Sequence, residues 1–477
     1  MSLRVRDSLS GQELEVGQAG EVGIYVCGPT VYNHIHIGNA RAPLFWDVVV
    51  RYLRSRDYEV TFVQNITDIE DKIINKANEE GVSWKEVVRR YTDSFHERLE
   101  MLDVGLPDVE PKATEHIPEM LHLIEELIQK GHAYAPGNGD VYYAVESFPD
   151  YGALTKQRPQ EMRETEKSQT GAKNSPLDFA LWKASKPGEP SWESLWGPGR
   201  PGWHIECSAM VEKHLPDGAD IHGGGTDLRF PHHENELAQS AAAHPDHTFV
   251  RAWAHHGMVN FADTGKMAKS LGNILDVKEA VERHGRNALR MWILQSHYSQ
   301  PIDYSEEILE EKRESYEHLM RSYRQLSNSK SSSKFSDRLA IELRERFDEA
   351  MRNDFDTQEA IAAIFDIVGK AGYQISSNPR EAVEFASLEE MLEEILSVLG
   401  FDIKGELEVE RDGVRIRYPA YVEPEEESLN ALVQRYVNRD KREWQKADQL
   451  REEIRAQGWE IEDTPGYVRI FHVQSSD

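Results

Sequence analysis

The fold is decided by residues 21–66, which read EVGIYVCGPTVYNHIHIGNARAPLFWDVVVRYLRSRDYEVTFVQNI. The apolar run 21–27 predicts a buried strand, residues 42–54 predict a helix, and residues 60–66 predict a second strand. A strand–helix–strand unit implies a parallel sheet. The helix carries the chain back to the end of the sheet where the first strand began, so the second strand runs in the same direction. The predicted class is therefore α/β.

The pattern of residue types changes several times along the rest of the chain. Residues 115–130 have a helical pattern, whereas residues from about 135 to 200 are rich in Pro, Gly and Ser and predict an irregular insertion in the sheet domain. After residue 305 the chain is helical and charged. A linker rich in Pro and Glu, residues 421–427, precedes a last small domain.

Composition narrows the class of protein. The formal net charge is -29, which argues against a non-specific nucleic-acid binder because such proteins are basic overall. The chain has no apolar run of the ~18 residues that a membrane helix needs, and its first residues lack the apolar core of a signal peptide. We therefore expect a cytoplasmic protein without a membrane partner. Its two cysteines are then expected to be thiols or metal ligands.

Both cysteines lie in segments suited to a metal. Cys27 ends the first predicted strand, and Cys207 precedes the run FPHHENE at residues 230–236. Zinc takes thiolate, imidazole and carboxylate ligands, and Cys27, Cys207, His232 and Glu236 would supply four of them. His232 and Glu236 are four residues apart, so a helix places them on one face. The alternative is two buried thiols beside a polar helix.

Two further motifs are suited to phosphate. HIHIGNAR, residues 34–41, precedes the first predicted helix, and a glycine at a helix start lets backbone N–H groups approach an anion. GKMAKSLGN, residues 265–273, carries two lysines three residues apart, which suits a triphosphate that builds charge during transfer. Taken singly, the first is equally an ordinary helix-capping turn and the second a solvated loop.

Together these motifs resemble a known family. HIGN, residues 36–39, resembles the HIGH motif of class I aminoacyl-tRNA synthetases, and KMAKS, residues 266–270, resembles their KMSKS motif. The flanking sequences resemble the cysteinyl-tRNA synthetases in particular, and the similarity covers nearly the whole chain. These flanks are YVCGPTVY (25–32), NITDIEDK (65–72), GWHIECSAM (202–210), HGGGTD (222–227), FPHHENE (230–236) and NDFDT (353–357).

The resemblance implies a domain order. It predicts a Rossmann-like, parallel-sheet catalytic domain over residues 1–305, with the connective insertion at about 135–200. A helical bundle follows over residues 306–400, and a small C-terminal anticodon-binding domain over residues 401–477. We expect the protein to be a monomer.

The family's zinc ligands match Cys27, Cys207, His232 and Glu236, so the resemblance implies one Zn²⁺ per chain that receives the thiolate of L-cysteine. Sulfur is a far better zinc ligand than a serine hydroxyl, and no editing domain is then needed. His233 is expected to be a hydrogen-bonding neighbour of the site. The expected cysteine-binding residues are Thr67, Trp203, His222 and Asp227.

The nucleotide site follows from the same resemblance. Catalysis is assigned to His36, Lys266 and Lys269, which would stabilise the α-phosphate and the leaving pyrophosphate of ATP, with Mg²⁺. Two departures from the family are Asn39 in place of a histidine and Ala268 in place of a serine. The expected ATP-binding residues are Gly28, Thr30, His36, Gly38, Asn39, Lys266 and Lys269.

The C-terminal stretch YVNRDKREWQKAD, residues 436–448, mixes cations with an aromatic residue. Single-stranded bases stack on aromatic rings, and arginine reads base edges or phosphate. Without the resemblance, a solvated amphipathic helix would be the preferred interpretation. The family's anticodon positions match Arg439, Trp444, Asp448 and Asp463, and the local cation cluster is Arg435, Arg439, Lys441, Arg442 and Lys446.

Three functions remain open at this point. The first is ATP-dependent ligation of L-cysteine to tRNA(Cys) through a cysteinyl-adenylate. The second is a ligase that joins zinc-bound cysteine to an amino sugar, although such relatives lack an anticodon domain and this chain continues past residue 425. The third is a non-catalytic zinc- and RNA-binding paralogue, against which His36, Lys266 and Lys269 argue.

Overall fold

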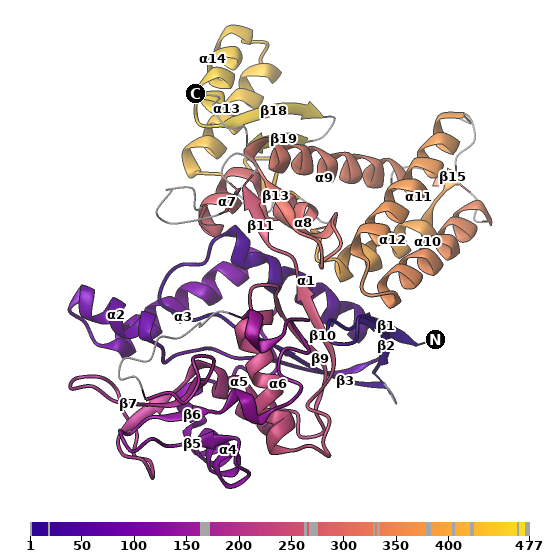
Figure 1. Cartoon of the computed structure of the whole chain (residues 1–477). Helices are drawn as coiled ribbons and strands as arrows, with labels where there is room; N and C mark the ends of the chain where they lie inside the picture. Colours follow the sequence, from indigo (N-terminus) through magenta and orange to yellow (C-terminus); the bar gives the residue numbers. More distant parts are fainter. Residues whose placement is uncertain are drawn as a thin grey trace.

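A parallel four-stranded sheet forms the centre of the first half of the chain, as expected from residues 21–66 (Figure 1). Its strand order is β10-β9-β3-β4, and every neighbouring pair is parallel. The strands are β3 (Glu21–Val26), β4 (Glu59–Gln64), β9 (Ala219–Gly225) and β10 (Val250–His256). All four carboxyl ends therefore lie along one edge, where open α/β sheets bind ligands.

The structure is a computed structural model that describes most of the chain. The described residues are 2–17, 20–162, 172–261, 265–266, 275–327, 330–331, 334–377, 383–402, 406–419, 424–464 and 467–472. Lys269 lies outside them, and of Lys266 only the backbone is described.

Helices cover both faces of the parallel sheet. Alternate strand residues such as Ile24 and Val26 share a hydrophobic cluster with Leu44 and Val48 of α1 (Ile37–Ser55). The intervening Tyr25, Val63 and Trp253 belong to a second cluster, with Met210 and Val211 of α5 (Trp203–His214). This alternation follows from the two-residue period of a strand, with both faces buried as parallel sheets require.

Helix α1 begins five residues earlier than the pattern 42–54 predicts, at Ile37. The reason is a cap: the imidazole of His36 accepts a hydrogen bond from Gly38 N, and the Asn39 amide oxygen accepts one from His36 N. Such reciprocal capping satisfies backbone donors that the first helical turn leaves unpaired. The HIGN motif is thus the N-terminal turn of α1.

The remaining elements between β4 and the end of the catalytic half surround the sheet. They are α2 (Asp71–Glu80), α3 (Trp84–Met101), α4 (Ile117–Gln129), η5 (Arg229–His233), α6 (Glu234–Ala243), β11 (Val259–Phe261), β12 (Gly265–Lys266), α7 (Val277–His284), α8 (Arg286–Leu294) and β13 (Ile302–Tyr304). Strands β12, β11 and β13 form a separate three-stranded sheet in that order.

The insertion is more regular than its composition predicts. It contains an antiparallel four-stranded sheet, β5-β6-β7-β8 (Ala133–Tyr134, Val141–Tyr143, Phe179–Ala184 and Gly199–Pro201). The expectation of an irregular segment over about 135–200 is therefore wrong for its described part. Strands β5, β6 and β8 have only two or three residues, too few for the alternating pattern that identifies a strand, and the six residues of β7 do not alternate because the first four are all buried. The register also shifts between Val141 and Tyr142.

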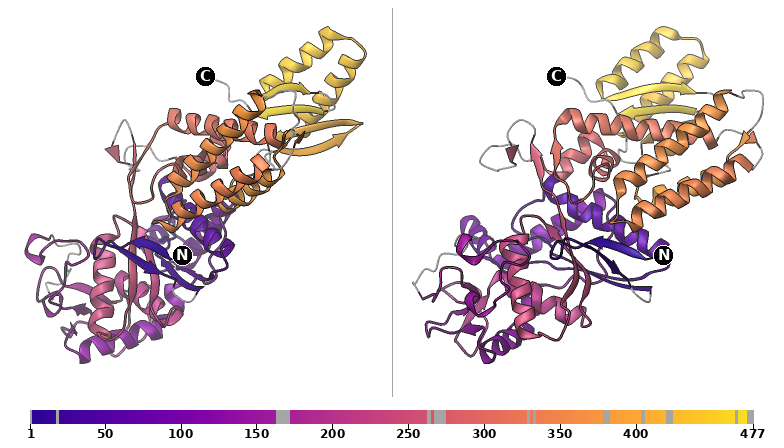
Figure 2. Two further views of the ribbon diagram at one scale, coloured as in Figure 1. Left: turned by 90° about the vertical axis from the view of Figure 1, so that its right-hand side faces the viewer. Right: turned by 45° about the vertical axis from the view of Figure 1, so that its right-hand side comes forward.

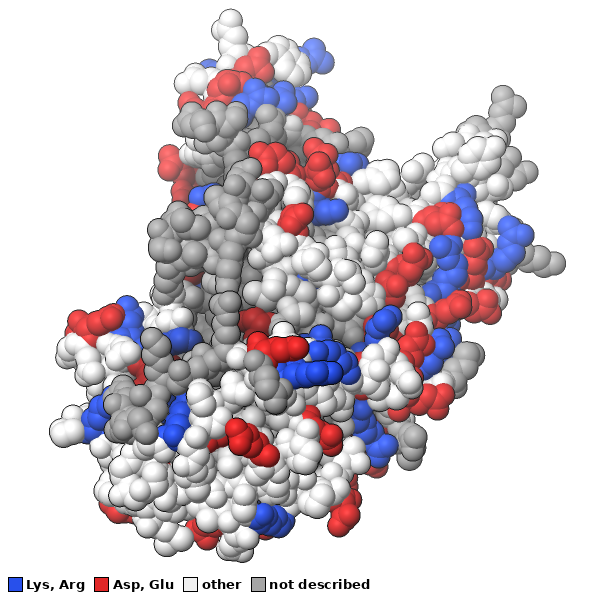
Figure 3. Space-filling model, in the orientation of Figure 1, with Lys and Arg blue, Asp and Glu red and all other residues white. Residues whose placement is uncertain are grey.

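The second half of the chain is helical and then mixed. Four long helices follow β13: α9 (Glu306–Ser327), α10 (Lys334–Arg352), α11 (Thr357–Ser377) and α12 (Ala386–Val398), with a two-strand pair β14 (Lys330–Ser331) and β15 (Val383–Glu384). In Figure 3, acidic and basic side chains lie side by side over the helices at the right. Ion pairs link these helices, as between Lys370 and Glu342 at 2.6 Å.

The C-terminal unit has its own core, built on Ile416, Leu432, Ile454 and Ile470. Its sheet runs β16-β17-β19-β18 (Glu406–Arg411, Val414–Pro419, Tyr467–His472 and Trp459–Thr464) and packs with α13 (Glu426–Asp440) and α14 (Trp444–Ala456). Figure 2 shows this unit at the far end of the molecule from the parallel sheet, with the long helices between them.

The N-terminal hairpin, β1 (Leu3–Arg6) and β2 (Glu13–Val16), joins distant parts of the chain. Ser8 N donates to the carbonyl of Trp253 in β10 at 2.9 Å. Asp354 N donates to the carbonyl of Arg4, and Arg6 N donates to the Asp354 carboxylate, each at 2.9 Å. The hairpin thus connects the parallel sheet with the turn between α10 and α11.

Among the described helices, none combines the length and the apolar character that crossing a bilayer requires.

Candidate functional site

The carboxyl edge of the parallel sheet brings the predicted metal ligands together. Cys27 directly follows β3, Cys207 lies in α5, His232 lies in η5 and Glu236 lies in the first turn of α6. Their ligand atoms all lie within 4.8 Å of one another, and three of the four residues are buried, Cys27 being half-buried. Four residues spread over 210 positions of sequence are thus collected at one point, as the strand-end argument predicts.

The spacing within this group suits a tetrahedral ion. Zinc–sulfur bonds of about 2.3 Å at tetrahedral angles place two thiolate sulfurs about 3.8 Å apart. The Cys27 and Cys207 sulfurs are 3.8 Å apart, and the Cys27 sulfur is 3.7 Å from Glu236 Oε1. His232 Nε2 lies 3.0 Å from the same carboxylate oxygen. The second oxygen, Glu236 Oε2, is buried and has no hydrogen-bond partner among the described residues, as expected of a group built to face a cation.

Burial and neighbouring groups shift the pKa values of the two thiols in opposite directions. Burial, together with the hydrogen bond to Cys207, raises the pKa of Cys27 well above the ordinary value. Burial also opposes ionisation of Cys207, but the hydrogen bond with Cys27 and the positive charge of His232 lower its pKa well below that value. Burial and the charge of Cys207 raise the pKa of Glu236. A bound cation favours the ionised forms that burial opposes.

Further histidines surround the group, and the sequence motifs predict only two of them, His222 and His233. His222 Nε2 lies 3.5 Å and His233 Nε2 lies 3.3 Å from the Cys27 sulfur. Burial lowers the pKa of both imidazoles well below the ordinary value, so both are neutral near pH 7. His204 and His255, which sequence reasoning misses, hydrogen-bond to His232 and His233 respectively.

The glycines of the motifs explain how backbone and rings approach so closely. A Cβ on Gly28 would lie 1.6 Å from the carbonyl oxygen of Asn65, so only glycine fits where this loop passes the end of β4. A Cβ on Gly224 would lie 2.5 Å from the His233 ring. Gly28 therefore has a packing reason as well as its expected role beside ATP.

The predicted cysteine-binding residues have different settings. Trp203 stacks on His232 with ring centroids 4.2 Å apart, and Thr67 is buried and donates to Glu206 Oε2 at 3.2 Å. Glu206 is a missed neighbour, fully buried, whose Oε1 has no hydrogen-bond partner among the described residues. Asp227 is exposed, in the turn that follows β9.

The nucleotide motif presents a defined donor. Because Gly38 N can only donate, His36 Nδ1 accepts, and the proton of the neutral imidazole is assigned to Nε2. His36 and Gly38 are half-buried and Asn39 is exposed. Asn39 uses its amide oxygen in the helix cap. The sequence identifies Asn39 as a replacement for the family's histidine and does not predict this role. Thr30 pairs with Thr67 through a parallel bridge at the same sheet edge.

The segment that carries the lysines is fastened to α1 at both of its described ends. Arg41, buried in α1, donates through Nη1 to the carbonyl of Gly257 at 2.6 Å, just before β11, and through Nη2 to Tyr298 and Gln300 at 3.1 and 2.5 Å. After residue 274, where the described residues resume, Ile37 N donates to the carbonyl of Leu275 at 3.1 Å. Lys266 begins this segment in β12, and Lys269 lies outside the described residues.

Three of the four expected anticodon residues lie together in the C-terminal unit. Arg439 forms an ion pair with Asp463 and places its guanidinium 5.9 Å from the ring centre of Trp444, which is 55% exposed. Asp448 is exposed, one turn beyond Trp444 in α14.

One expectation for this stretch and its alternative, a single amphipathic helix, are both wrong. Arg435, which the cation cluster includes, is only 3% exposed and pairs with both oxygens of Asp463 at 2.7 Å, so it does not face a partner. The stretch 436–448 is not one helix, because α13 ends at Asp440 and α14 begins at Trp444.

Comparison with known proteins gives consistent matches. The family profile "tRNA synthetases class I (C) catalytic domain" matches residues 13–314, and the profile "DALR domain" matches residues 346–404. A cysteine–tRNA ligase of Rubrobacter xylanophilus is 71% identical over 464 residues, which cover 97% of this chain and 98% of the relative. A cysteine–tRNA ligase of Halorhodospira halophila is 44% identical over 97% of this chain and 98% of its own.

Among solved structures, the methionyl-tRNA synthetase of Mycobacterium tuberculosis bound to methionyl-adenylate aligns with a TM-score of 0.60. The alignment covers 80% of this chain and 89% of that one at 16% identity, and so it speaks for the fold alone.

Proposed function

The chain belongs to the cysteine–tRNA ligase family of class I synthetases, and on that premise we propose that it joins L-cysteine to tRNA(Cys) through a cysteinyl-adenylate, with the cysteine thiol selected by a zinc ion. The observation that carries this proposal is the group Cys27, Cys207, His232 and Glu236, whose ligand atoms lie within 4.8 Å of one another. Their donor types and spacing fit one Zn²⁺.

A bound zinc ion supplies a position for the substrate's sulfur and favours its thiolate form. Thr67, Trp203, His222 and Asp227 are proposed to shape the rest of the cysteine pocket. Trp203, stacked on His232, offers an apolar wall, and Asp227 offers a carboxylate for the substrate's ammonium group. A hydroxyl in place of the thiol is a poor zinc ligand, so serine is rejected at this step.

In the proposed first reaction, the carboxylate of cysteine attacks the α-phosphorus of ATP and pyrophosphate leaves. His36 Nε2–H, Lys266 and Lys269 stabilise the charge on the phosphates, with Mg²⁺. Gly28, Thr30, Gly38 and Asn39 line the nucleotide near the N-terminus of α1, whose backbone N–H groups favour an anion. In the second reaction, the 2′-hydroxyl of the tRNA's terminal adenosine attacks the carbonyl of the adenylate, and AMP leaves.

Arg41→Lys is expected to lower kcat of cysteine-dependent ATP–pyrophosphate exchange about 10- to 100-fold, because a misplacement of ~1 Å can cost that much. Arg41 fixes the start of the lysine segment against the helix that carries His36, and a lysine ammonium cannot replace the fork that bonds Gly257, Tyr298 and Gln300. The KM for cysteine should stay unchanged. Exchange kinetics and the melting temperature are measured together.

Arg290→Lys is the matched control. Arg290 is also fully buried and donates to the carbonyls of Leu399 and Leu102, but no described bond joins it to the lysine segment. It should lower the melting temperature and leave kcat near that of the unsubstituted enzyme. Equal losses of kcat in both variants would show that Arg41 acts only through stability.

Trp444→Ala is expected to lower kcat/KM for tRNA charging about 5- to 150-fold, the worth of one stacked base at ~1–3 kcal/mol, and to leave pyrophosphate exchange unchanged. The exposed Trp444 ring lies beside Arg439, and both positions match the family's anticodon residues, as do Asp448 and Asp463. Trp444→Phe keeps an aromatic face and should retain most charging. Equal losses in charging and exchange would mean that α14 is structural.

The overall proposal is tested by pyrophosphate exchange with cysteine and with serine, followed by charging of purified tRNA. Exchange that depends on cysteine and charging of tRNA(Cys) support it, whereas transfer of cysteine to an amino sugar alone would replace it. The relatives cover 97% of the chain, including the C-terminal unit, which favours tRNA as the acceptor. We further propose a cytoplasmic monomer with domains at residues 1–305, 306–400 and 401–477.

A further inference from the structure

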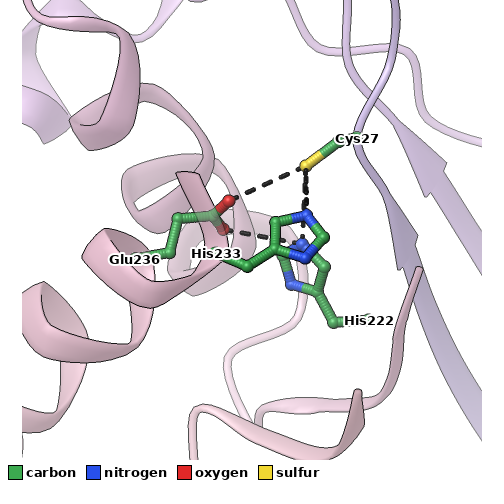
Figure 4. A group of neighbouring side chains, drawn as sticks. All are labelled: Cys27, His222, His233 and Glu236. Atoms are coloured by element: carbon green, nitrogen blue, oxygen red, sulfur yellow. Dashed lines mark hydrogen bonds and ion pairs between the residues drawn. The ribbon is translucent and has the colours of Figure 1, made fainter. Parts of the chain in front are cut away.

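A second group of four possible ligands overlaps the first. It consists of Cys27, His222, His233 and Glu236, and its ligand atoms also lie within 4.8 Å of one another (Figure 4). The two groups share Cys27 and Glu236 and differ in the other pair, which is Cys207 and His232 in the first and two histidines in the second. In Figure 4 the Cys27 sulfur points toward both imidazoles and toward the Glu236 carboxylate.

The distances in the second group are those of a coordination sphere. With zinc–sulfur bonds of about 2.3 Å and zinc–nitrogen or zinc–oxygen bonds of about 2.0–2.2 Å, tetrahedral ligands lie about 3.6 Å (S to N) and about 3.4 Å (N to O) apart. The Cys27 sulfur is 3.5 Å from His222 Nε2 and 3.3 Å from His233 Nε2. His222 Nε2 is 3.5 Å from Glu236 Oε2, the oxygen without a hydrogen bond.

One of the two histidines, His233, is also held as metal ligands usually are. His233 Nδ1 hydrogen-bonds to His255 Nε2 at 2.9 Å, and His255 Nδ1 to Ser8 Oγ at 2.9 Å, so the other ring nitrogen of His233 faces Cys27. His222 has no hydrogen bond at Nδ1 among the described residues and is held instead by stacking on Trp253, with centroids 4.6 Å apart and an angle of 27°. In the first group His232 is oriented as His233 is, because its Nδ1 lies 3.0 Å from His204 Nδ1. Such outer partners fix the direction of a ligating imidazole.

We propose that the site has two alternative ligand sets, so that a divalent ion bound to Cys27 and Glu236 is completed either by Cys207 and His232 or by His222 and His233. The proposal rests on the proposed zinc site. The set with two thiolates favours soft ions, whereas the set with two imidazoles and one thiolate suits cobalt, nickel and copper as well as zinc. An ion that loses the first set therefore stays in the site instead of leaving it.

Cobalt(II) is the probe, because sulfur-to-cobalt charge-transfer absorbance reports the number of thiolate ligands. The full-length protein is loaded with Co²⁺ alone, and bound metal and absorbance per bound ion are measured. His232→Gln breaks the first set without removing a thiol. It should keep about one Co²⁺ per chain, with absorbance reduced to about half as the thiolate ligands fall from two to one.

Cys207→Ala should likewise keep about one Co²⁺ per chain with about half of the absorbance. His222→Gln breaks only the second set, so its bound Co²⁺ and its absorbance should match those of the unsubstituted protein. The double variant Cys207→Ala with His222→Gln should bind less than about a tenth of one equivalent, since neither set is complete. Circular dichroism checks the fold of each variant.

Full absorbance in His232→Gln, or loss of the ion from Cys207→Ala while the unsubstituted protein binds it, overturns the proposal. His222 and His233 would then only hydrogen-bond to Cys27 and Glu236. If the unsubstituted protein binds no Co²⁺ or Zn²⁺, the proposed zinc site falls too, so the two failures are distinct.

Discussion

The Cys27→Ser variant is expected to lose its bound zinc and to activate cysteine about 1,000-fold more slowly, a change of ~4 kcal/mol in kcat/KM for pyrophosphate exchange. Cys27 belongs to both groups of possible ligands, so no set of four survives its removal. A hydroxyl is a far weaker zinc ligand than a thiolate, and the substrate's sulfur then has no partner in the pocket. Metal content by elemental analysis and exchange kinetics check the two effects together.

Met210→Leu provides the matched control for this variant. Met210 is buried in the same hydrophobic cluster as Cys207, three residues along α5, and carries no ligand. A change of similar volume there costs less than ~1.5 kcal/mol of stability and should leave zinc and exchange intact. Full zinc content together with full exchange in Cys27→Ser would contradict the metal-based selection of cysteine.

His36→Asn is expected to lower kcat for activation by about 100- to 1,000-fold, ~2.7–4 kcal/mol, as does removal of one preorganised donor from other active sites. His36 has two roles that this substitution separates. Its Nδ1 caps α1 by accepting from Gly38 N, and its Nε2–H is the donor proposed to face the α-phosphate. Asparagine is a favoured N-cap residue and keeps the first role only. Exchange rates and KM values for ATP and cysteine are the measurement.

His36→Ala completes the comparison. It loses the cap as well as the donor, so it should be less stable than His36→Asn by ~1 kcal/mol while its kcat is similar. If His36→Asn retains full kcat and only His36→Ala is slow, the histidine serves the helix and not the phosphate. A rise in the KM for cysteine alone would likewise contradict the assignment to ATP.

The sequence predicts the site better than its surroundings, and the reason is local. Cys27 directly follows a strand, His222 lies within one and His232 and Glu236 share a helical face, so short motifs place them at one edge of a parallel sheet. The start of α1 at Ile37 depends on a cap formed by His36 and Asn39. The sequence suggests a capping turn only as the alternative to a phosphate site, and it does not indicate where the helix begins.

What could not be predicted depends on pairs far apart in the chain. No sequence motif predicts that His255 orients His233, because only the pairing of β10 with β9 brings His255 beside the site. The sequence suggests that Arg435 is a surface cation. In the structure it is buried and paired with Asp463, which lies 28 residues later in the chain. The strands of the insertion are two to six residues long, and a register shift interrupts their pattern.

The hairpin at the N-terminus has a consequence for how the chain is made. The partner of Arg6, Asp354, is 348 residues away, and at ribosomal speeds of ~5–20 residues per second the hairpin waits roughly 20–70 s for it. A lone two-stranded hairpin is marginally stable in water. Ser8, which holds His255 and through it His233, bonds to Trp253 of β10 and is therefore fixed only when more than half of the chain has been synthesised. The first strand to leave the ribosome thus gains its last partner only when Asp354 has been made, and the metal site acquires its final geometry only once β10 has been synthesised.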